Sequence, residues 1–300
     1  MGRQGAGGKE GSMSGARRRE FRCRDDLVIN YEVCGSGGQP VVFLHGFGAA
    51  LSTWDDIRDL LPRGGHRFIF LDLKGFGRSS RPDDGAYGPA DHAAILLAFL
   101  EAENLAGSVL VGHSLGGGIA LLAWLAARSR GKEELIGGLV LIDAAAYLSR
   151  LPPVFRLIRI PLLGWAILNL LPVSLMVRYV LFRIYHDRRS VTPARIARYV
   201  SVYGSRESAR VLAGSARQLI PGNLAEITAS YRQIDLPVLI IWGEDDPIIR
   251  ADSGRRLHRD IPRSRLEVFS RCGHNPHEEK PAETAAAVAA FLADFFHTPH

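Results

Sequence analysis

The sequence is poor in several residues and motifs that mark common protein classes. Its 300 residues include three cysteines, too few and odd in number for a disulfide framework, so we expect a reducing compartment. Phosphate-binding loops, the nicotinamide fingerprint and the His-Glu-x-x-His zinc motif are missing from the sequence. We therefore expect neither a cofactor nor a metal site.

The amino terminus lacks the apolar segment of a secretory signal peptide. Residues 1–20 are rich in Gly, Ser, Arg and Lys, and we interpret them as a disordered basic tail. Absence of that signal favours a cytoplasmic protein.

Acidic residues are scarce in one internal stretch. The chain carries a net charge of +6, yet residues 147–232 alone hold 13 arginines against three acidic side chains. No nucleic-acid-binding motif accompanies them, so we expect no nucleic-acid partner. The arginines alternate with long aliphatic runs, which favours contact with lipid or with an acidic, apolar substrate.

Residues 160–177 have no charged side chain over 18 positions, near the lower limit of roughly 17–25 residues for a membrane span. Pro161, Gly164 and Pro172 interrupt the run, and proline usually ends a helix. We expect two short helices whose apolar faces roof a pocket. Peripheral contact of these helices with a membrane is the alternative.

Outside that stretch, short apolar strands alternate with helical patterns. Such alternation predicts an α/β fold, in which a parallel sheet has helices on both faces. The prediction divides the chain into a core of residues 21–147 and 233–300 and an inserted helical cap or lid of residues 148–232. The expected strands include residues 41–44, 68–71, 109–111, 137–142, 237–242 and 266–269.

One stretch organises the rest of the core. An apolar strand runs into Gly112-His113-Ser114-Leu115-Gly116, and an apolar helix pattern follows. This Gly-x-Ser-x-Gly order predicts a nucleophile elbow, a turn so tight that Gly112 and Gly116 are needed because a β-carbon would not fit. It lifts the Ser114 hydroxyl above the sheet and places the Leu115 N–H at a helix N-terminus.

The partners of a serine nucleophile follow in the expected order. Asp246 lies just after the apolar strand 237–242, and His274 lies after the next strand, so His274 should reach both Ser114 and Asp246 at the carboxyl edge of the sheet. The Phe47 N–H, just past strand 41–44, would join the Leu115 N–H in an oxyanion hole. His45 and Gly46 precede it, and we expect His45 to hold that loop in shape.

These motifs resemble those of the α/β-hydrolase superfamily, over residues 21–147 and 233–297. The motifs are His45-Gly46-Phe47-Gly48, Gly112-His113-Ser114-Leu115-Gly116-Gly117, Gly243-Glu244-Asp245-Asp246-Pro247 and Gly273-His274-Asn275-Pro276-His277. The resemblance implies a mostly parallel eight-stranded sheet, with Ser114 as nucleophile, Asp246 as acid and His274 as base. Phe47 and Leu115 would donate to the oxyanion. A loop at residues 72–79 also matches, although Lys74 replaces the commoner proline or arginine.

Several neighbours have other interpretations. Asp245 is the residue most easily confused with Asp246, and Asp143 occupies the acid position of some relatives. We expect His113 to pack and form hydrogen bonds beside the serine. His277 and Glu278 should cap the final helix or order the loop.

The nucleophile limits the reaction. Dehalogenases and epoxide hydrolases of this superfamily use Asp where this chain has Ser114. Carbon–carbon bond hydrolases have an aromatic residue after the catalytic histidine, where this chain has Asn275. We expect a serine hydrolase that cleaves carboxylic esters of hydrophobic acyl groups through an acyl-enzyme. A carbon–carbon bond hydrolase or acyltransferase on the same triad, or a non-catalytic small-molecule receptor, are the alternatives.

Overall fold

The structure is a computed structural model, and it describes residues 16–62, 64–147, 153–203 and 206–297. Eight strands form one sheet in the order β1-β2-β4-β3-β5-β6-β7-β8. Only the β1–β2 and β2–β4 pairs are antiparallel, so the mostly parallel eight-stranded sheet is confirmed. The strands are β1 Arg17–Arg24, β2 Leu27–Cys34, β3 Gln39–Leu44, β4 His66–Leu71, β5 Ser108–His113, β6 Ile136–Ile142, β7 Val238–Gly243 and β8 Ser264–Phe269.

The predicted tail was too long at its carboxyl end. Residues 1–15 lie outside the described residues, but β1 begins at Arg17, within the segment assigned to the tail. Arg17 pairs with Val33 and Glu20 with Asn30 of β2. The side chains of residues 17–20 are exposed, and backbone pairing at a sheet edge does not require apolar side chains.

Both faces of the central strands are buried. Alternate residues of β3 point to opposite sides, so that Val42 and Leu44 join one hydrophobic cluster while Val41 and Phe43 join the other. One face is covered by α2 Pro89–Ala102, α3 Leu115–Ser129 and α10 Ala251–Asp260. The opposite face is covered by the short segments η1 Leu51–Trp54 and α1 Asp55–Arg58 together with α12 Pro281–His297.

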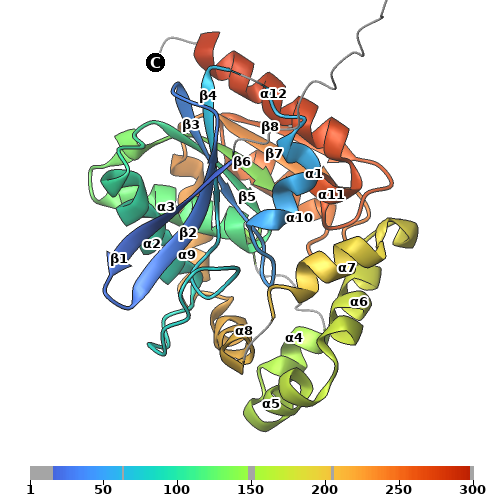
Figure 1. Cartoon of the computed structure of the whole chain (residues 1–300). Helices are drawn as coiled ribbons and strands as arrows, with labels where there is room; N and C mark the ends of the chain where they lie inside the picture. The colour runs from blue at the N-terminus through green and yellow to red at the C-terminus, as the bar shows by residue number, and fades with distance from the viewer. Residues whose placement is uncertain (1–15, 63, 148–152, 204–205, 298–300) are drawn as a thin grey trace, which may run out of the picture.

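The described residues between β6 and β7 contain helices and turns. After α4 Pro153–Ile158, Pro161 starts α5 (Pro161–Leu170) and Pro172 precedes α6 (Val173–Ile184), so these prolines separate two helices as expected. The rest are η3 Arg188–Ser190, α7 Pro193–Val200, α8 Arg206–Gln218, α9 Leu224–Ser230 and η4 Tyr231–Gln233. In Figure 1, α4–α7 gather at one end of the molecule, on the side away from most of α12.

None of the described helices is by itself long and apolar enough to cross a membrane. Leu162–Leu170 and Val173–Ile184 meet the length and composition test only as a pair, and that pair is bent by 105°.

Candidate active site

Ser114 occupies the sharp turn between β5 and α3. Its φ of 52° and ψ of −114° lie outside the regions favoured by residues with a side chain, a strain typical of functional turns. A β-carbon on Gly112 would lie 2.5 Å from the Gly116 carbonyl oxygen, and one on Gly116 would lie 2.2 Å from that of Leu44. Both glycines therefore let backbone approach backbone around the serine, as the sequence predicts.

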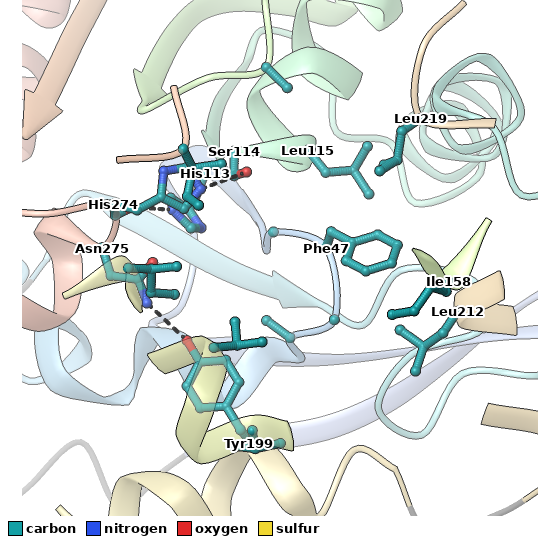
Figure 2. Close-up of a pocket in the computed structure, with 18 of the residues that line it drawn as sticks. Phe47, His113, Ser114, Leu115, Ile158, Tyr199, Leu212, Leu219, His274 and Asn275 are labelled. Atoms are coloured by element: carbon teal, nitrogen blue, oxygen red, sulfur yellow. Dashed lines mark hydrogen bonds between the residues drawn. The ribbon is translucent and has the colours of Figure 1, made fainter. Parts of the chain in front are cut away.

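The hydroxyl of Ser114 is the first member of a hydrogen-bonded chain. Its Oγ lies 3.0 Å from His274 Nε2, and His274 Nδ1 lies 2.7 Å from Asp246 Oδ2. The other oxygen of Asp246 accepts the Ile248 and Ile249 N–H groups at 2.7 and 3.0 Å, which fixes the carboxylate. Figure 2 shows His274 pointing at Ser114 beside the cavity. Because Nδ1 faces the carboxylate, Nε2 is left to accept the serine proton.

The two neighbouring acids have different surroundings. Asp245 is half exposed, and its carboxylate pairs with His186 Nδ1 at 2.8 Å and not with His274. Asp143 is fully buried at the end of β6, where its Oδ1 accepts the Gly243 N–H at 3.0 Å. Burial raises the pKa of Asp143 well above its usual value, and the charge of Asp246 raises this pKa further. The raised pKa favours the neutral form of Asp143.

His113 supports the loop that carries His274. Its Nε2 donates to the His274 carbonyl oxygen at 2.7 Å, which fixes the tautomer of His113. Burial lowers the pKa of His113 well below its usual value, so the ring is neutral. Gly46 packs beside it, and a β-carbon there would lie 2.8 Å from His113 Nδ1 and 3.3 Å from Ser114 Cβ.

His45 connects two loops beneath the serine. Its Nδ1–H donates to the Gly46 carbonyl at 2.8 Å, and its Nε2 accepts the Leu73 N–H at 3.0 Å. This arrangement requires the neutral ring, and burial lowers the pKa of His45 accordingly. Phe47 directly follows Gly46, where a β-carbon would lie 3.3 Å from Ser114 Cβ, and Leu115 directly follows Ser114 as the first residue of α3.

One group of side chains has the spacing of a metal site. The candidate ligand atoms of His113, Asp143 and His274 all lie within 4.8 Å of one another. However, His274 already uses both ring nitrogens, on Ser114 and Asp246, and Asp143 is held in its neutral form. Since metal ligands must be deprotonated and available, these residues do not fit a metal.

The predicted roles of His277 and Glu278 were wrong in part, since neither caps the final helix. Both lie in α11, Pro276–Glu279. The Nε2 of His277 lies 2.9 Å from Thr53 Oγ1. Glu278 is buried and accepts hydrogen bonds from Asn275 Nδ2 at 2.7 Å and Tyr199 Oη at 2.8 Å, besides one from Tyr185.

Glu278 therefore does order the loop after His274, and Glu279, which the sequence analysis did not select, orders it as well. Its carboxylate accepts the Gly273 and Asn275 N–H groups at 3.0 and 3.2 Å, and the His186 N–H of the cap at 2.8 Å. The sequence signal for this role is a carboxylate four to six residues after the N–H groups of Gly273 and Asn275. Such spacing is common, and it does not indicate the contact with the cap.

Lys74, where the chain departs from the superfamily motif, has a structural role. Its side chain is buried, and Nζ donates to Asp84 at 2.6 Å and to the Ala86 carbonyl at 2.7 Å. The ammonium also lies 4.6 Å from the centre of the Tyr87 ring. A buried lysine is thus fully paired, and it closes the loop after β4.

A cavity of about 240 Å³ lies between Ser114 and the cap. Its floor includes Phe47, Ser114 and His274, and most of its remaining lining is aliphatic. Among the described residues that line it, none is Lys, Arg, Asp or Glu. The arginines of the cap therefore do not supply a binding site for an acidic substrate inside the cavity. The α6 side chains in the lining are Val173, Met176, Val177, Val180, Leu181 and Ile184.

A parallel sheet that presents a serine on a strand-to-helix elbow, with a histidine and an aspartate from loops after later strands, defines the α/β-hydrolase class. The family model described as alpha/beta hydrolase fold matches residues 39–281, and the chain belongs to this family.

Two curated relatives and one solved structure are similar to the chain over most of its length. It is 32% identical to the 2-hydroxymuconate semialdehyde hydrolase of Pseudomonas sp. (strain CF600), over 86% of this chain and 88% of that protein. It is 26% identical to lipase 3 of Moraxella sp. (strain TA144), over 89% of this chain and 81% of that protein. A putative lipase of Acinetobacter baumannii AYE superposes with a TM-score of 0.78 at 23% identity, covering 98% of this chain and 99% of that one. That likeness shows the fold.

Proposed function

We propose that this protein is a serine hydrolase that cleaves carboxylic esters of hydrophobic acyl groups. One observation carries the proposal: the Ser114–His274–Asp246 hydrogen-bonded chain opens into a cavity with an uncharged, mostly aliphatic lining. A neutral carboxylic ester with an apolar acyl chain fits such a lining, because no charge has to be removed from water.

In the first half of the reaction, Ser114 Oγ gives its proton to His274 Nε2 and attacks the ester carbonyl carbon. Asp246 holds the ring and stabilises the imidazolium that forms. The carbonyl oxygen becomes an oxyanion, which the Phe47 and Leu115 N–H groups bind. One such donor is typically worth about 3–4 kcal/mol of transition-state stabilisation.

In the second half, the imidazolium of His274 protonates the leaving alcohol, and the carbonyl bond reforms as an acyl-enzyme on Ser114. Water then gives a proton to His274 and attacks the acyl carbon. Collapse of the second oxyanion returns the proton to Ser114 and releases the carboxylic acid.

The test is hydrolysis of p-nitrophenyl esters from acetate to palmitate by the wild type and by Ser114→Ala. We expect turnover that depends on chain length and a loss of roughly 10⁴-fold or more in the variant. A fluorophosphonate probe should label the wild type and leave the variant unlabelled. Absence of turnover on every ester, together with an unlabelled Ser114, would reject the proposal.

Carbon–carbon bond hydrolysis on the same triad is a second candidate, favoured by the 32% identity to the semialdehyde hydrolase. Another relative, 30% identical, is named for a dioate, a substrate with two carboxylates. The uncharged lining of the cavity and Asn275 after His274 speak against such a substrate here. Assay of a ring-cleavage dienoate beside the esters separates the two: faster turnover of the dienoate would favour this candidate.

A further inference from the structure

The cap carries a large exposed apolar surface, which we call the cap patch. Among the residues that the structure describes, ten large hydrophobic side chains are exposed. Nine of them belong to the cap patch, and the tenth, Leu60, lies outside the cap. Leu162 is 85% exposed, Leu170 69% and Trp165 60%. A concentration of exposed apolar side chains in one segment is typical of an interaction site. The patch consists of Leu157, Ile160, Leu162, Leu163, Trp165, Leu170, Leu171, Leu175 and Tyr179.

Helix α6 shows that the patch is separate from the cavity. Residues 173, 176, 177, 180, 181 and 184 line the cavity at helical spacing. On the opposite side of the helix, Leu175 and Tyr179 are exposed, together with Arg178 and Arg183. One face of α6 is therefore needed for the cavity, and a second apolar face has no partner among the described residues.

The charges around the patch have one sign. The sequence from 148 to 186 contains no acidic residue. Among the residues that the structure describes, no ion pair is formed by Arg156, Arg159, Arg178 or Arg183, and three of these side chains are exposed. Exposed aliphatic and aromatic side chains match the apolar acyl region of a bilayer surface, and the unpaired arginines that flank them match its anionic headgroups.

We propose that the cap patch docks on an anionic phospholipid bilayer. The apolar side chains of α4–α6 enter the outer acyl region, and the four arginines contact lipid phosphates. Figure 1 shows that α4, α5 and α6 lie at the end of the molecule, so that a flat surface can meet them there.

The geometry favours contact with the surface over insertion across it. The two apolar helices meet at 105°, and one face of α6 is committed to the cavity beside Ser114. A second copy of the chain is the less favourable occupant, since a two-fold contact through this patch would oppose arginines to arginines.

The chain contains its own probe of docking. Of its four tryptophans, Trp54, Trp124 and Trp242 are at most 1% exposed, and Trp165 in the patch is 60% exposed. We expect phosphatidylglycerol–phosphatidylcholine vesicles to shift the Trp165 emission to the blue and to protect it from iodide. Trp165→Phe should abolish the shift while the protein still cosediments with vesicles.

Substitutions define what the patch contributes. Leu162→Asp should lower partitioning to anionic vesicles at least tenfold, while the matched control Leu60→Asp leaves it unchanged. Arg156→Gln and Arg183→Gln should each lower partitioning about fivefold, and added salt should reduce the effect. Arg259→Gln, an exposed arginine of α10, is the charge-matched control.

Hydrolysis of a soluble short-chain ester should be the same in all these variants, which separates docking from the proposed function. Equally strong binding to vesicles of phosphatidylcholine alone would overturn the proposal that the cap patch docks on an anionic surface. No vesicle binding, with a dimer that Leu162→Asp dissociates, would assign the patch to a second copy and overturn the proposal. Vesicle binding remains measurable if the protein cleaves no ester.

Discussion

Replacement of Asp246 by Asn tests the hydrogen-bonded chain and its buried neighbour together. The new side-chain amide would present either its oxygen or its NH₂ to His274 Nδ1, which lies 2.7 Å from the carboxylate in the wild type. It cannot stabilise the imidazolium with a charge, and an NH₂ there favours the tautomer that cannot accept the serine proton. On these grounds alone kcat/KM should fall by roughly 10⁴-fold.

Asp143 changes that expectation. Burial and the charge of Asp246 raise its pKa and favour its neutral form, and one of its carboxylate oxygens lies within 4.8 Å of a His274 ring nitrogen. Without the Asp246 charge, Asp143 can ionise and attract the imidazolium. At an effective dielectric constant of about 20, two unit charges at this distance attract by about 3 kcal/mol, or roughly 10²-fold in rate. We therefore expect Asp246→Asn to retain about 10²-fold more activity than the Asp143→Asn/Asp246→Asn double variant.

The assay is kcat/KM for a p-nitrophenyl ester as a function of pH. Because the ionised form of Asp143 is the active one, the residual activity of Asp246→Asn should rise as pH passes through the pKa of Asp143. Asp143→Asn alone should stay within a few-fold of wild type, since an amide oxygen can still accept the Gly243 N–H and Asn tolerates a φ of 42°. Equal activity of Asp246→Asn and the double variant at every pH would refute the reasoning.

Three further predictions concern stability. Gly116→Ala should lower the melting temperature and abolish activity, because the new β-carbon would lie 2.2 Å from the Leu44 carbonyl oxygen. Thermal unfolding and the ester assay would measure these two effects. Although burial raises the pKa of Asp84, the hydrogen bond from Lys74 helps lower it to about 2. The Lys74–Asp84 pair should contribute about 1–2 kcal/mol to the free energy of unfolding above pH 4. This contribution should be lost as the pH falls through 2, which acid unfolding of the wild type and of Asp84→Asn would measure. Glu278→Gln should cost about 1–3 kcal/mol in urea unfolding, because the buried groups that donate to it lose a charged acceptor.

The elbow and its partners were predictable because their determinants are local. Gly112 and Gly116 report a turn that excludes β-carbons, and a strand before and a helix after it fix its place on the sheet. Asp246 and His274 follow strands whose carboxyl ends meet at one edge, so parallel topology alone brings them to Ser114. Nothing about the cap is needed for this inference.

Contacts between cap and core could not be predicted in the same way. Glu278 is an acidic residue on a short polar helix, a pattern typical of a solvated surface, yet the cap buries it beneath Tyr185 and Tyr199. Its partners lie 79 and 93 residues away in sequence, and no periodicity indicates such a pairing. The start of the first strand was misplaced for a related reason, because the pairing of residues 17–20 depends on backbone groups and their side chains carry no apolar pattern.

The excess of arginine in the cap divides into two groups once the structure is known. Arg195 and Arg198 both pair with Asp56 of α1, and Arg210 pairs with Asp83, so these cations hold the cap to the acidic core. They account for part of the core's acidic excess and require no external partner. The second group has no carboxylate partner among the described residues, and it includes Arg188, Arg217 and Arg232. Its other members, Arg156, Arg159, Arg178 and Arg183, flank the exposed apolar side chains of α4–α6. Four charges that the core does not neutralise therefore lie on the surface that also lacks an apolar partner, and an anionic bilayer satisfies both at once.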